Sequence, residues 1–440
     1  MTQPALDFRV YDTVEALLKL QPEWDKLLSE FPTATTFSTL DWLLPWWRAF
    51  GKGQLKVIGF FDSGALVGLA PLCVVPHPVG AGVKLKLLRL IGDGSGDSDN
   101  LDFPVRPGYE PAFIDALLGL LARGDRIEWD FCRFNTVPEN SPALAVLTSR
   151  LEQRGWQCFT SERPWLVTHL PPVWEDYLAQ LSSEHRNNLK RYSKRLQKHF
   201  QVEIRKCTEE ADLPQCLAEL FRLHQKRWEL RGEPGTFASA ARRAFYLDLS
   251  RTLLAHEKLE FWLISLNGVA AAAQFCFRYG ESVFLLQEGF DPDHSADRVG
   301  FILRGHVLEQ LTAAGVRRYD FLFGQSEGKN IWVPQLHHYR DMEFAKPGSM
   351  GGVYLQATHA AHDGKEWLRA HLPESAWAVL HNLNPRRRPA TGKADVKKQA
   401  EPPSSGREMP VETAAAQTAE AKTAESRNPE NEKAEVKTPE

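Results

Sequence analysis

Cysteine is scarce in this chain, and no two cysteines have the Cys-x-x-Cys spacing. The 440 residues include six cysteines, of which Cys73 and Cys276 lie inside apolar, strand-like runs. Scattered cysteines of this kind are typical of reduced, buried thiols and argue against a disulfide framework. The neighbours His337 and His338 do not combine with Glu or Cys in a zinc-ligand spacing, and neither do His359 and His362. The sequence therefore predicts no metal site.

Long apolar runs are also missing. The N-terminal residues "MTQPALDF" lack the charged and apolar regions of a signal peptide. No apolar run reaches the roughly 20 residues that a membrane-spanning helix needs. These features predict a cytoplasmic protein.

A strong net charge is the third feature that the chain lacks. The formal charge is −3, and residues 1–385 carry 42 Lys and Arg against 46 Asp and Glu. Only "SSEHRNNLKRYSKRLQKHF" (182–200) is markedly basic, with six Lys and Arg between Glu184 and Phe200. A dedicated nucleic-acid-binding protein usually has a broader positive surface, so nucleic acid is not the expected partner.

Aromatic residues are absent from the C-terminal tail. Residues 386–440 contain no Phe, Trp or Tyr and are rich in Ala, Pro, Glu, Lys and Thr, a composition that predicts disorder. The preceding segment "EWLRAHLPESAWAVLHNL" (366–383) has an apolar helical face, broken at Pro373, which we expect to pack on the preceding domain. Peripheral membrane association through this face and the adjacent "RRR" (386–388) is the alternative.

The body of the chain follows one plan twice. The segments "LKVIGFFDSGALVGLAPLCVV" (55–75) and "LEFWLISLNGVAAAAQFCFRY" (259–279) each predict a β-hairpin, the second with an Asn-Gly turn. Helical segments precede each hairpin, and a strand, a helix and another strand follow it. This order predicts a mixed α/β (α+β) fold with two similar domains in tandem.

The expected divisions are an N-terminal domain at 1–170, a C-terminal domain at 171–348, a helical extension at 349–385 and the disordered tail at 386–440. In the second domain, the helices before the hairpin are expected at 182–200, 213–230 and 239–255.

The basic stretch reads as an amphipathic helix. Its apolar residues Leu189, Tyr192, Leu196 and Phe200 recur at spacings of three and four, which predicts one buried face. Its cations form two further stripes, which are Arg186, Lys190 and Lys194, and Arg191, Arg195 and Lys198. A packed structural helix is the first interpretation, a wall for an anionic substrate the second, and a nucleic-acid reader the third.

Residues 274–332, beginning "QFCFRYGESVFLLQEGFDPDHSADRVGFILRGH" and ending "RRYDFLFGQSEGKNIW", resemble the signature region of the FemAB/CelD-like branch of the GNAT acyltransferase superfamily. The resemblance extends to "RNNLKRYSKRL" (186–196) and "LFRLHQKRWELRGEPGTF" (220–237), and covers roughly residues 35–345. It implies a pair of GNAT-like domains, the second being the acyltransferase, and a role in cellulose or exopolysaccharide biosynthesis.

An acyl-CoA enzyme must hold a pyrophosphate, and a helix N-terminus with free backbone N–H groups serves this purpose. The strand "SVFLLQEGF" ends at Phe290, and a helix is expected to begin near Val299 after a polar loop. The resemblance implies that the phosphate loop lies at this point. Its residues here are Arg298, Val299, Gly300 and Phe301, a shortened form of the usual pattern. A helix start whose glycine packs on the sheet is the alternative.

A second glycine-rich stretch, "GDGSGDSDN" (92–100), is not expected to bind phosphate, because Asp93, Asp97 and Asp99 would repel it. We expect a loop between the two domains, in which Asp99 could contact an amine or a sugar hydroxyl.

Transfer from a thioester to an amine or hydroxyl requires a base, oxyanion stabilisation and an acid. Glu288, at the strand end beside the expected phosphate loop, is the candidate base, and Gln287 is a candidate substrate ligand. Tyr319 is the candidate acid, and its neighbour Asp320 is the alternative residue facing the substrate. Adjacent strand residues point to opposite faces, so only one residue of each pair can face the site.

The remaining candidates for substrate binding are cations and one aromatic residue. Arg186 and Arg191 match positions that recur in the family's helix, and both could bind phosphate or carboxylate. Arg227 and Trp228, in "LHQKRW", could face a sugar. Lys329, in "GQSEGKNIW", could neutralise an anion, a surface turn being the alternative.

These features predict an N- or O-acyltransferase that uses acetyl-CoA or another acyl-CoA and acts in polysaccharide or envelope biosynthesis. Its expected acceptor is anionic or contains a sugar. A FemAB-type aminoacyl-tRNA-dependent transferase and a non-catalytic partner of a polysaccharide synthase complex are the alternatives.

Overall fold

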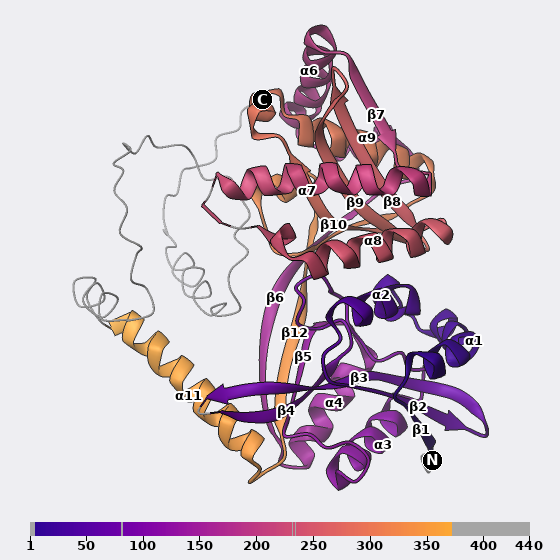
Figure 1. The fold of residues 1–440 in the computed structure, drawn as a ribbon, viewed down its shortest axis with the longest axis vertical. Coiled ribbons are helices and arrows are strands. Elements are labelled where there is room, and N and C mark those ends of the chain that lie inside the picture. The colour runs from indigo at the N-terminus through magenta and orange to yellow at the C-terminus, as the bar shows by residue number, and fades with distance from the viewer. Residues whose placement is uncertain (1–4, 81, 231, 234, 372–440) are drawn as a thin grey trace, which may run out of the picture. The chain divides into compact units, whose positions relative to one another are not determined.

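The structure, a computed structural model, describes residues 5–371 apart from 81, 231 and 234, and is built around one sheet of twelve strands (Figure 1). The strand order is β1-β2-β3-β4-β5-β12-β6-β11-β10-β9-β8-β7. The strands are β1 (Asp7–Tyr11), β2 (Gln54–Asp62), β3 (Ala65–Gly80), β4 (Val83–Leu90), β5 (Phe131–Pro138), β6 (Gln157–His169), β7 (Val202–Lys206), β8 (Leu259–Leu266), β9 (Val269–Tyr279), β10 (Ser282–Phe290), β11 (Arg318–Phe323) and β12 (Gln335–Ala345). The helices are α1 (Val14–Glu30), α2 (Leu40–Phe50), α3 (Glu110–Arg123), α4 (Pro142–Gln153), α5 (Trp174–Gln180), α6 (Ser183–His199), α7 (Leu213–Glu229), α8 (Ala240–Ala255), α9 (Val299–Ala313), α10 (Glu327–Asn330) and α11 (Met350–His371).

The same order of elements occurs twice, as the sequence predicts. In the first half β2, β3 and β4 are antiparallel neighbours, and α3 then leads to β5, which pairs with β4 in parallel. In the second half β8, β9 and β10 are antiparallel, and α9 leads to β11, which pairs with β10 in parallel. The predicted tandem of mixed α/β units is therefore confirmed.

Both predicted hairpins form through turns with positive φ at two consecutive residues. The φ angles are 49° at Ser63 and 85° at Gly64 in the first hairpin, and 50° at Asn267 and 83° at Gly268 in the second. Asparagine and glycine tolerate this left-handed conformation at low cost, and it matches the twist of the flanking strands. The two turns thus fix the register of β2 against β3 and of β8 against β9.

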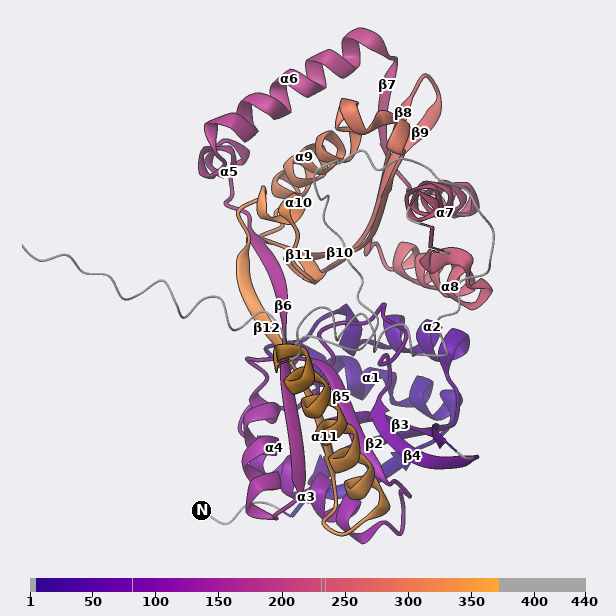
Figure 2. The same cartoon turned by 90° about the vertical axis from the view of Figure 1, so that its left-hand side faces the viewer.

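Helices cover both faces of the second half of the sheet (Figure 2). On one face α7 packs on β9 and β10 and α8 packs on β8, while α9 packs on the opposite face and α6 packs on α9. Alternate residues of β9 therefore enter different cores. Phe275 contacts Tyr246 of α8, with ring centroids 5.2 Å apart, whereas Cys276 is buried with residues of α9.

The loop at 92–100 contacts elements of both halves. Ser95 and Ser98 accept hydrogen bonds of 2.9 Å from the indole N–H groups of two tryptophans of α2. Asp97 forms an ion pair of 2.9 Å with Arg242 of α8, and Asp99 accepts a hydrogen bond of 3.1 Å from the backbone N–H of Phe323 at the end of β11. These carboxylates bind protein groups, in keeping with the expected loop between the halves.

The two halves share one continuous sheet, because β12 pairs with β5 on one side and β6 on the other, and β6 pairs with β11. The expected domain boundary at residue 170 therefore stays a prediction.

The expected extension begins as α11, which packs on β12 and β5. Its remainder, 372–385, and the tail at 386–440 lie outside the described residues. Within the described ranges, no helix combines the length and the apolar character needed to span a bilayer.

Candidate active site

The N-terminus of α9 is open and has no side-chain cap. Strand β10 runs into a 3₁₀ turn (Pro292–Asp297), and α9 starts after Arg298, whose φ of 57° is left-handed. A Cβ built on Gly300 would meet only the Cβ of Phe290, 3.9 Å away. The first N–H groups of a helix have no intrahelical acceptors, and they attract an anion together with the helix dipole. Here the backbone can therefore approach a phosphate.

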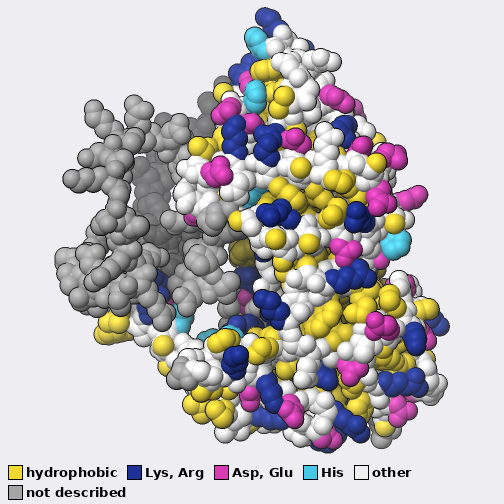
Figure 3. Space-filling view, viewed as in Figure 1, with side chains coloured by type: hydrophobic (Ala, Val, Ile, Leu, Met, Phe, Trp, Pro, Cys, Tyr) yellow, Lys and Arg dark blue, Asp and Glu magenta, His cyan; other side chains and the backbone are white. Residues whose placement is uncertain are grey.

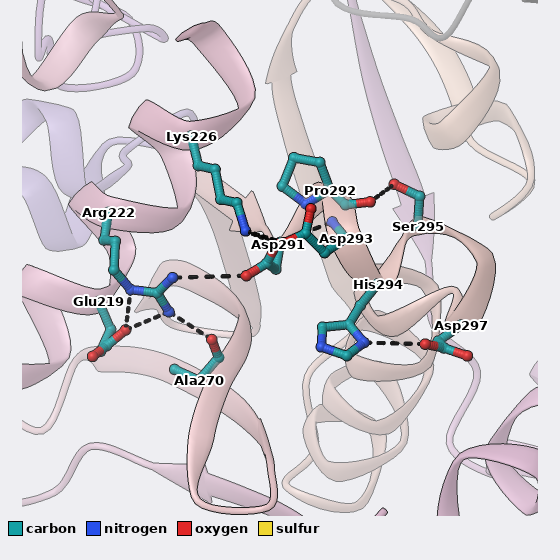
Figure 4. Close-up of polar contacts among 10 residues, drawn as sticks. All are labelled: Glu219, Arg222, Lys226, Ala270, Asp291, Pro292, Asp293, His294, Ser295 and Asp297. Carbon is teal, nitrogen blue, oxygen red and sulfur yellow. Dashed lines mark hydrogen bonds and ion pairs between the residues drawn. The ribbon is translucent and has the colours of Figure 1, made fainter. Parts of the chain in front are cut away.

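The turn before α9 carries three carboxylates, which are paired with cations of α7 and α6. Figure 4 shows the contacts made by Lys226 and Arg222 of α7 and by His294. Lys226 Nζ lies 2.6 Å from Asp291 Oδ1 and 2.6 Å from Asp293 Oδ2. Asp297 lies 3.0 Å from a guanidinium nitrogen of Arg195 and 3.1 Å from His294 Nδ1.

These cations compensate the negative charge of the turn. Burial alone would raise the pKa of Asp291, but hydrogen bonding to Lys226 holds it below its usual value. Hydrogen bonding to His294 and Arg195 lowers the pKa of Asp297 despite some desolvation. Asp291 and Asp297 are therefore ionised at neutral pH. Arg222, 3.7 Å from Asp291, is also paired with Glu219 at 2.7 Å, so the cations and carboxylates around this turn are close to balanced.

The strands β10 and β11 separate before β10 reaches Phe290, the residue next to this helix start. They pair in parallel over three residue pairs, ending at Phe284 and Asp320. Beyond this point β10 has a bulge between Leu285 and Gln287, and Leu322 of β11 has a left-handed φ of 56°. The two irregularities turn the strands apart, because a bulge bends the strand that carries it.

An ion pair between Glu288 and Arg304 lies where the strands separate. Arg304, on α9, is 6% exposed, forms a salt bridge with Glu288 of β10 and donates a hydrogen bond to the carbonyl of Gly328 in α10. Burial alone would raise the pKa of Glu288, but the charges of Arg304 and Arg227 hold it below its usual value. Glu288 is therefore a carboxylate at neutral pH.

Lys329 and Asp320 surround the end of β11. Lys329 Nζ donates to the carbonyls of Phe321, Phe323 and Gly324, at 2.8–3.0 Å. Burial lowers the pKa of Lys329 to about 8, although Glu288 opposes the shift. Burial also raises the pKa of Asp320 to about 8. At neutral pH Lys329 is thus mostly charged and Asp320 mostly protonated, and both can exchange a proton near pH 8.

Tyr319 and Gln287 occupy different surroundings. The Tyr319 side chain is fully buried on the α9 side of the sheet, with its hydroxyl 3.7 Å from Cys276 Sγ and 3.5 Å from Gln274 Oε1. Burial raises its pKa well above the usual value, so Tyr319 keeps its proton. Gln287 is half-buried and lies opposite Phe275 of β9. Their expected catalytic and binding roles stay predictions.

The two arginines expected to bind substrate on α6 make local contacts. Arg186 donates to the carbonyls of Leu178, Ala179 and Leu181 at the end of α5. Arg191 bonds Asn188 and lies over the ring of Tyr192, 4.9 Å from its centroid. Among the described residues, no recorded contact joins either arginine to Glu288. The expected substrate contacts of both stay predictions.

On α7 the structure separates the expected pair. Trp228 is buried and donates its indole N–H to His224 Nε2 at 2.9 Å. Arg227 lies 5.9 Å from the ring centroid of Phe290, and its charge acts on Glu288. The structure therefore brings Arg227 to the candidate site and places Trp228 in the core.

Within α9, Val299 is buried, whereas Phe301 is half-buried and packs against Trp332 with ring centroids 5.1 Å apart. These side chains fix the helix start, and its backbone is what remains available to a ligand. Across the described parts of the chain, no group of three His, Cys, Asp or Glu side chains is arranged to hold a metal ion.

The sequence analysis missed Arg304. A sequence signal for it exists in "FILRGHVLEQL", where one arginine lies among apolar residues in a helix that is buried on nearly every side. A charged residue at such a position needs a partner, because an unpaired buried charge is costly. That partner is the expected base, Glu288.

Comparisons with known proteins agree with this geometry. Residues 183–330, about a third of the chain, match a family described as "Acetyltransferase (GNAT) domain". A crystal structure of FemX has a TM-score of 0.54 at 12% identity, covering 73% of this chain and 95% of the FemX chain.

Two further solved structures are less similar. They are L-PGS from Bacillus licheniformis (TM-score 0.44, 13% identity, 77% of this chain and 96% of that one) and a tandem GNAT protein from the clavulanic acid biosynthesis pathway (0.42, 11%, 78% and 99%). A search of curated protein sequences finds no match.

The matched segment runs from the start of α6 to the end of α10 and so contains the whole candidate site. At 12% identity the likeness to FemX shows a shared fold. The predicted resemblance to the FemAB/CelD-like branch is confirmed. Residues 183–330 thus match the acetyltransferase (GNAT) domain family, in a chain with the fold of FemX.

Proposed function

We propose that this protein transfers an acyl group from acetyl-CoA or another acyl-CoA to an amine or hydroxyl of an anionic or sugar-containing acceptor. We further propose that the reaction belongs to polysaccharide or envelope biosynthesis, as the family resemblance implies. The observation that carries the proposal is the uncapped N-terminus of α9, open at Gly300, which lies against Phe290 at the end of the part of β10 that β11 does not pair.

Charge around this helix start supports a phosphate ligand. The three carboxylates of the preceding turn are compensated by Lys226, Arg222 and Arg195, and Arg298 adds a further cation. The helix N-terminus contributes about half a positive charge of its own. Because Arg222 is also paired with Glu219, the positive field that a phosphate would meet here comes mainly from the helix N-terminus and Arg298. We propose that Arg298, Val299, Gly300 and Phe301 hold the pyrophosphate through their backbone.

The groups beyond the helix start can serve the transfer itself. Acyl transfer removes a proton from the acceptor and returns one to the leaving thiolate. Glu288 is ionised, and the charge of Arg304 balances its own and lowers its affinity for a proton. It is therefore a weak base, better suited to orienting the acceptor or a water molecule. Lys329, with a pKa of about 8, can give or take a proton near neutral pH. We propose that Glu288 positions the acceptor and that Lys329 exchanges the proton.

Thermal unfolding with acetyl-CoA tests the donor site. The native chain should be stabilised, and Gly300→Glu should abolish the shift, because its carboxylate would occupy the phosphate position. Gly119→Glu is a matched control, since Gly119 also lies in a helix with open space around it and far along the chain from α9. If neither acetyl-CoA nor a longer acyl-CoA stabilises the native chain, the proposed donor is wrong.

A FemAB-type aminoacyl-tRNA-dependent transferase is the second candidate, favoured by the fold shared with FemX. Binding to RNA would then fall steeply with salt. On the face shown in Figure 3, Lys and Arg side chains are interspersed with Asp and Glu, which favours the acyl-CoA donor. A tRNA mobility shift that disappears at moderate salt would reverse this order. If the protein transfers neither an acyl group from acyl-CoA nor an aminoacyl group from tRNA, the third candidate is left, a non-catalytic partner of a polysaccharide synthase.

A further inference from the structure

Three arginines lie around the side chain of Tyr192 beside the start of α9. Arg191 donates a hydrogen bond of 3.2 Å to the Tyr192 hydroxyl and lies 4.9 Å from the ring centroid. Arg195, one turn further along α6, lies 5.6 Å from the same centroid. Arg298, the residue that precedes α9, also donates a hydrogen bond to this hydroxyl. These four residues, the arginine cluster, thus join two neighbouring helices, α6 and α9 (Figure 2).

Two of the three guanidinium groups have no carboxylate partner. Arg195 is paired with Asp297 at 3.0 Å. For Arg191 and Arg298, no ion pair is recorded among the residues that the structure describes, and both side chains are exposed. Arg191 bonds instead to the neutral amide oxygen of Asn188, at 2.8 Å. Arg191 and Arg298 therefore keep positive charges that the protein leaves uncompensated.

The neighbouring carboxylates are directed elsewhere. Asp291 and Asp293 of the turn before α9 are paired with Lys226 of α7. Glu184, the only carboxylate of α6, lies about two helical turns from Arg191. Like charges held close together repel each other, so the cluster is stabilised by an anion that binds between its arginines.

The charge and shape of the cluster favour a phosphate monoester. Such a group carries about 1.5 to 2 negative charges at pH 7 and has three terminal oxygens. A guanidinium group binds phosphate oxygens through two parallel N–H donors. A carboxylate or a phosphodiester has a single negative charge and would leave one of the two guanidinium groups unmatched. Arg191 and Arg298 together thus match a phosphate monoester better than either of these anions.

The cluster lies on the nucleotide side of the proposed pyrophosphate position. This position is the start of α9, beside Phe290, whereas the acyl group must reach Glu288 on β10. The pyrophosphate of an acyl-CoA carries the acyl arm at one end and the nucleotide at the other. Since α9 packs on the sheet and α6 packs on α9, an acyl arm directed to the sheet directs the nucleotide toward α6. Arg298 lies between the two phosphate positions.

We propose that Arg191 and Arg298 bind the 3′-phosphate on the ribose of the CoA nucleotide, and that this contact makes the protein select CoA over its dephosphorylated form. This inference rests on the proposed acyl-CoA donor and gives that donor a second anchoring point. Tyr192 acts as a positioning residue, because its hydroxyl accepts hydrogen bonds from both guanidinium groups. Arg195 holds the turn before α9 through Asp297.

Isothermal titration calorimetry on the full chain with acetyl-CoA and acetyl-3′-dephospho-CoA tests the proposal. The native chain should bind acetyl-CoA about tenfold more tightly at low salt, and this ratio should shrink as salt is added. Arg191→Met should weaken acetyl-CoA about fivefold and leave the affinity for the dephosphorylated form unchanged. Arg191→Lys, which keeps the charge, should retain part of the ratio. Tyr192→Phe should reduce the ratio about twofold, because both guanidinium groups lose their common acceptor.

Two control variants separate this inference from the proposed donor. Arg123→Met removes an exposed arginine from the last turn of α3 and should change neither affinity. Gly300→Glu should weaken both forms alike, because both carry the pyrophosphate. If the native chain binds the two forms equally, or if Arg191→Met keeps the native ratio, the inference is overturned and the acyl-CoA donor stands. If neither form binds, the donor is wrong and the inference falls with it.

Discussion

The ion pair between Glu288 and Arg304 offers a quantitative test of the candidate site. Arg304→Met keeps the length of the side chain but leaves the carboxylate without its nearest cation. Removing one partner of a buried ion pair typically costs about 3–5 kcal/mol. The Glu288 side chain is 38% exposed, so water offsets much of this cost. We expect the free energy of unfolding to fall by about 1–2 kcal/mol.

The two partners should respond unequally. The Arg304 side chain is only 7% exposed, so Glu288→Gln leaves the more deeply buried charge unpaired. This variant should lose about 2–4 kcal/mol, more than Arg304→Met. The double variant should recover part of the sum, giving a coupling energy of about 1–2 kcal/mol in a double-mutant cycle.

The pH dependence has a defined sign. The pKa of Glu288 is lower in the folded than in the unfolded chain, so the stability that the pair contributes is present above the unfolded pKa of about 4.3. It is lost as pH falls through the lower folded pKa. The difference in stability between the native chain and Arg304→Met should therefore be largest at pH 7 and shrink below about pH 4.

Urea unfolding followed by circular dichroism at several pH values measures these differences. Gly119→Ala, at an open helix position, serves as a variant that leaves the pair intact. A loss below about 0.5 kcal/mol in both single variants, or a double variant whose loss equals their sum, would refute a direct coupling between the two side chains.

Three further variants test other parts of the site. Lys226→Met should weaken acetyl-CoA binding about threefold to tenfold, because Asp291 and Asp293 lose their shared cation; calorimetry checks this against Lys190→Met, and equal affinities would contradict it. Since the pKa of Lys329 is about 8, kcat should rise between pH 7 and 9 as this amine loses its proton, and Lys329→Met should lose that rise; an unchanged profile would remove Lys329 from the proton transfer. Gly305→Ala should cost about 1–3 kcal/mol in thermal unfolding because the new methyl group meets Leu189, whereas Gly119→Ala should stabilise α3 slightly; similar effects of both would argue against close packing of α6 on α9.

Local sequence patterns were sufficient to predict much of the fold. The hairpin turns at Ser63–Gly64 and Asn267–Gly268 could be found because Gly and Asn adopt positive φ, and the structure has positive φ at all four residues. The helix expected near Val299 starts at that residue. Periodicity also identified the inner face of α6, where Leu196 is buried and Tyr192 half-buried.

The candidate site was less accessible to the same reasoning. The hydrogen bonds from Arg186 to the last carbonyls of α5 could not be predicted from the sequence. They depend on the angle between α5 and α6, which neither helix encodes alone. Arg304 was missed for two reasons. A periodicity analysis treats a charged residue as exposed, and the partner of Arg304, Glu288, belongs to a different element. Such pairs depend on which strand lies under which helix, and that follows from the whole sheet.

The place of β12 in the sheet has a consequence for how the chain is made. Strand β5 belongs to the first half, yet its neighbour β12 comes from residues 335–345, near the end of the described chain. During synthesis, β5 therefore keeps an unpaired edge until about two hundred further residues have left the ribosome, and unpaired edges invite association with other chains. A fragment ending at residue 170 would keep that edge permanently. We expect such a fragment to aggregate unless a peptide of residues 335–345 is supplied, which gives biochemists a way to rebuild the first half of the sheet from two pieces.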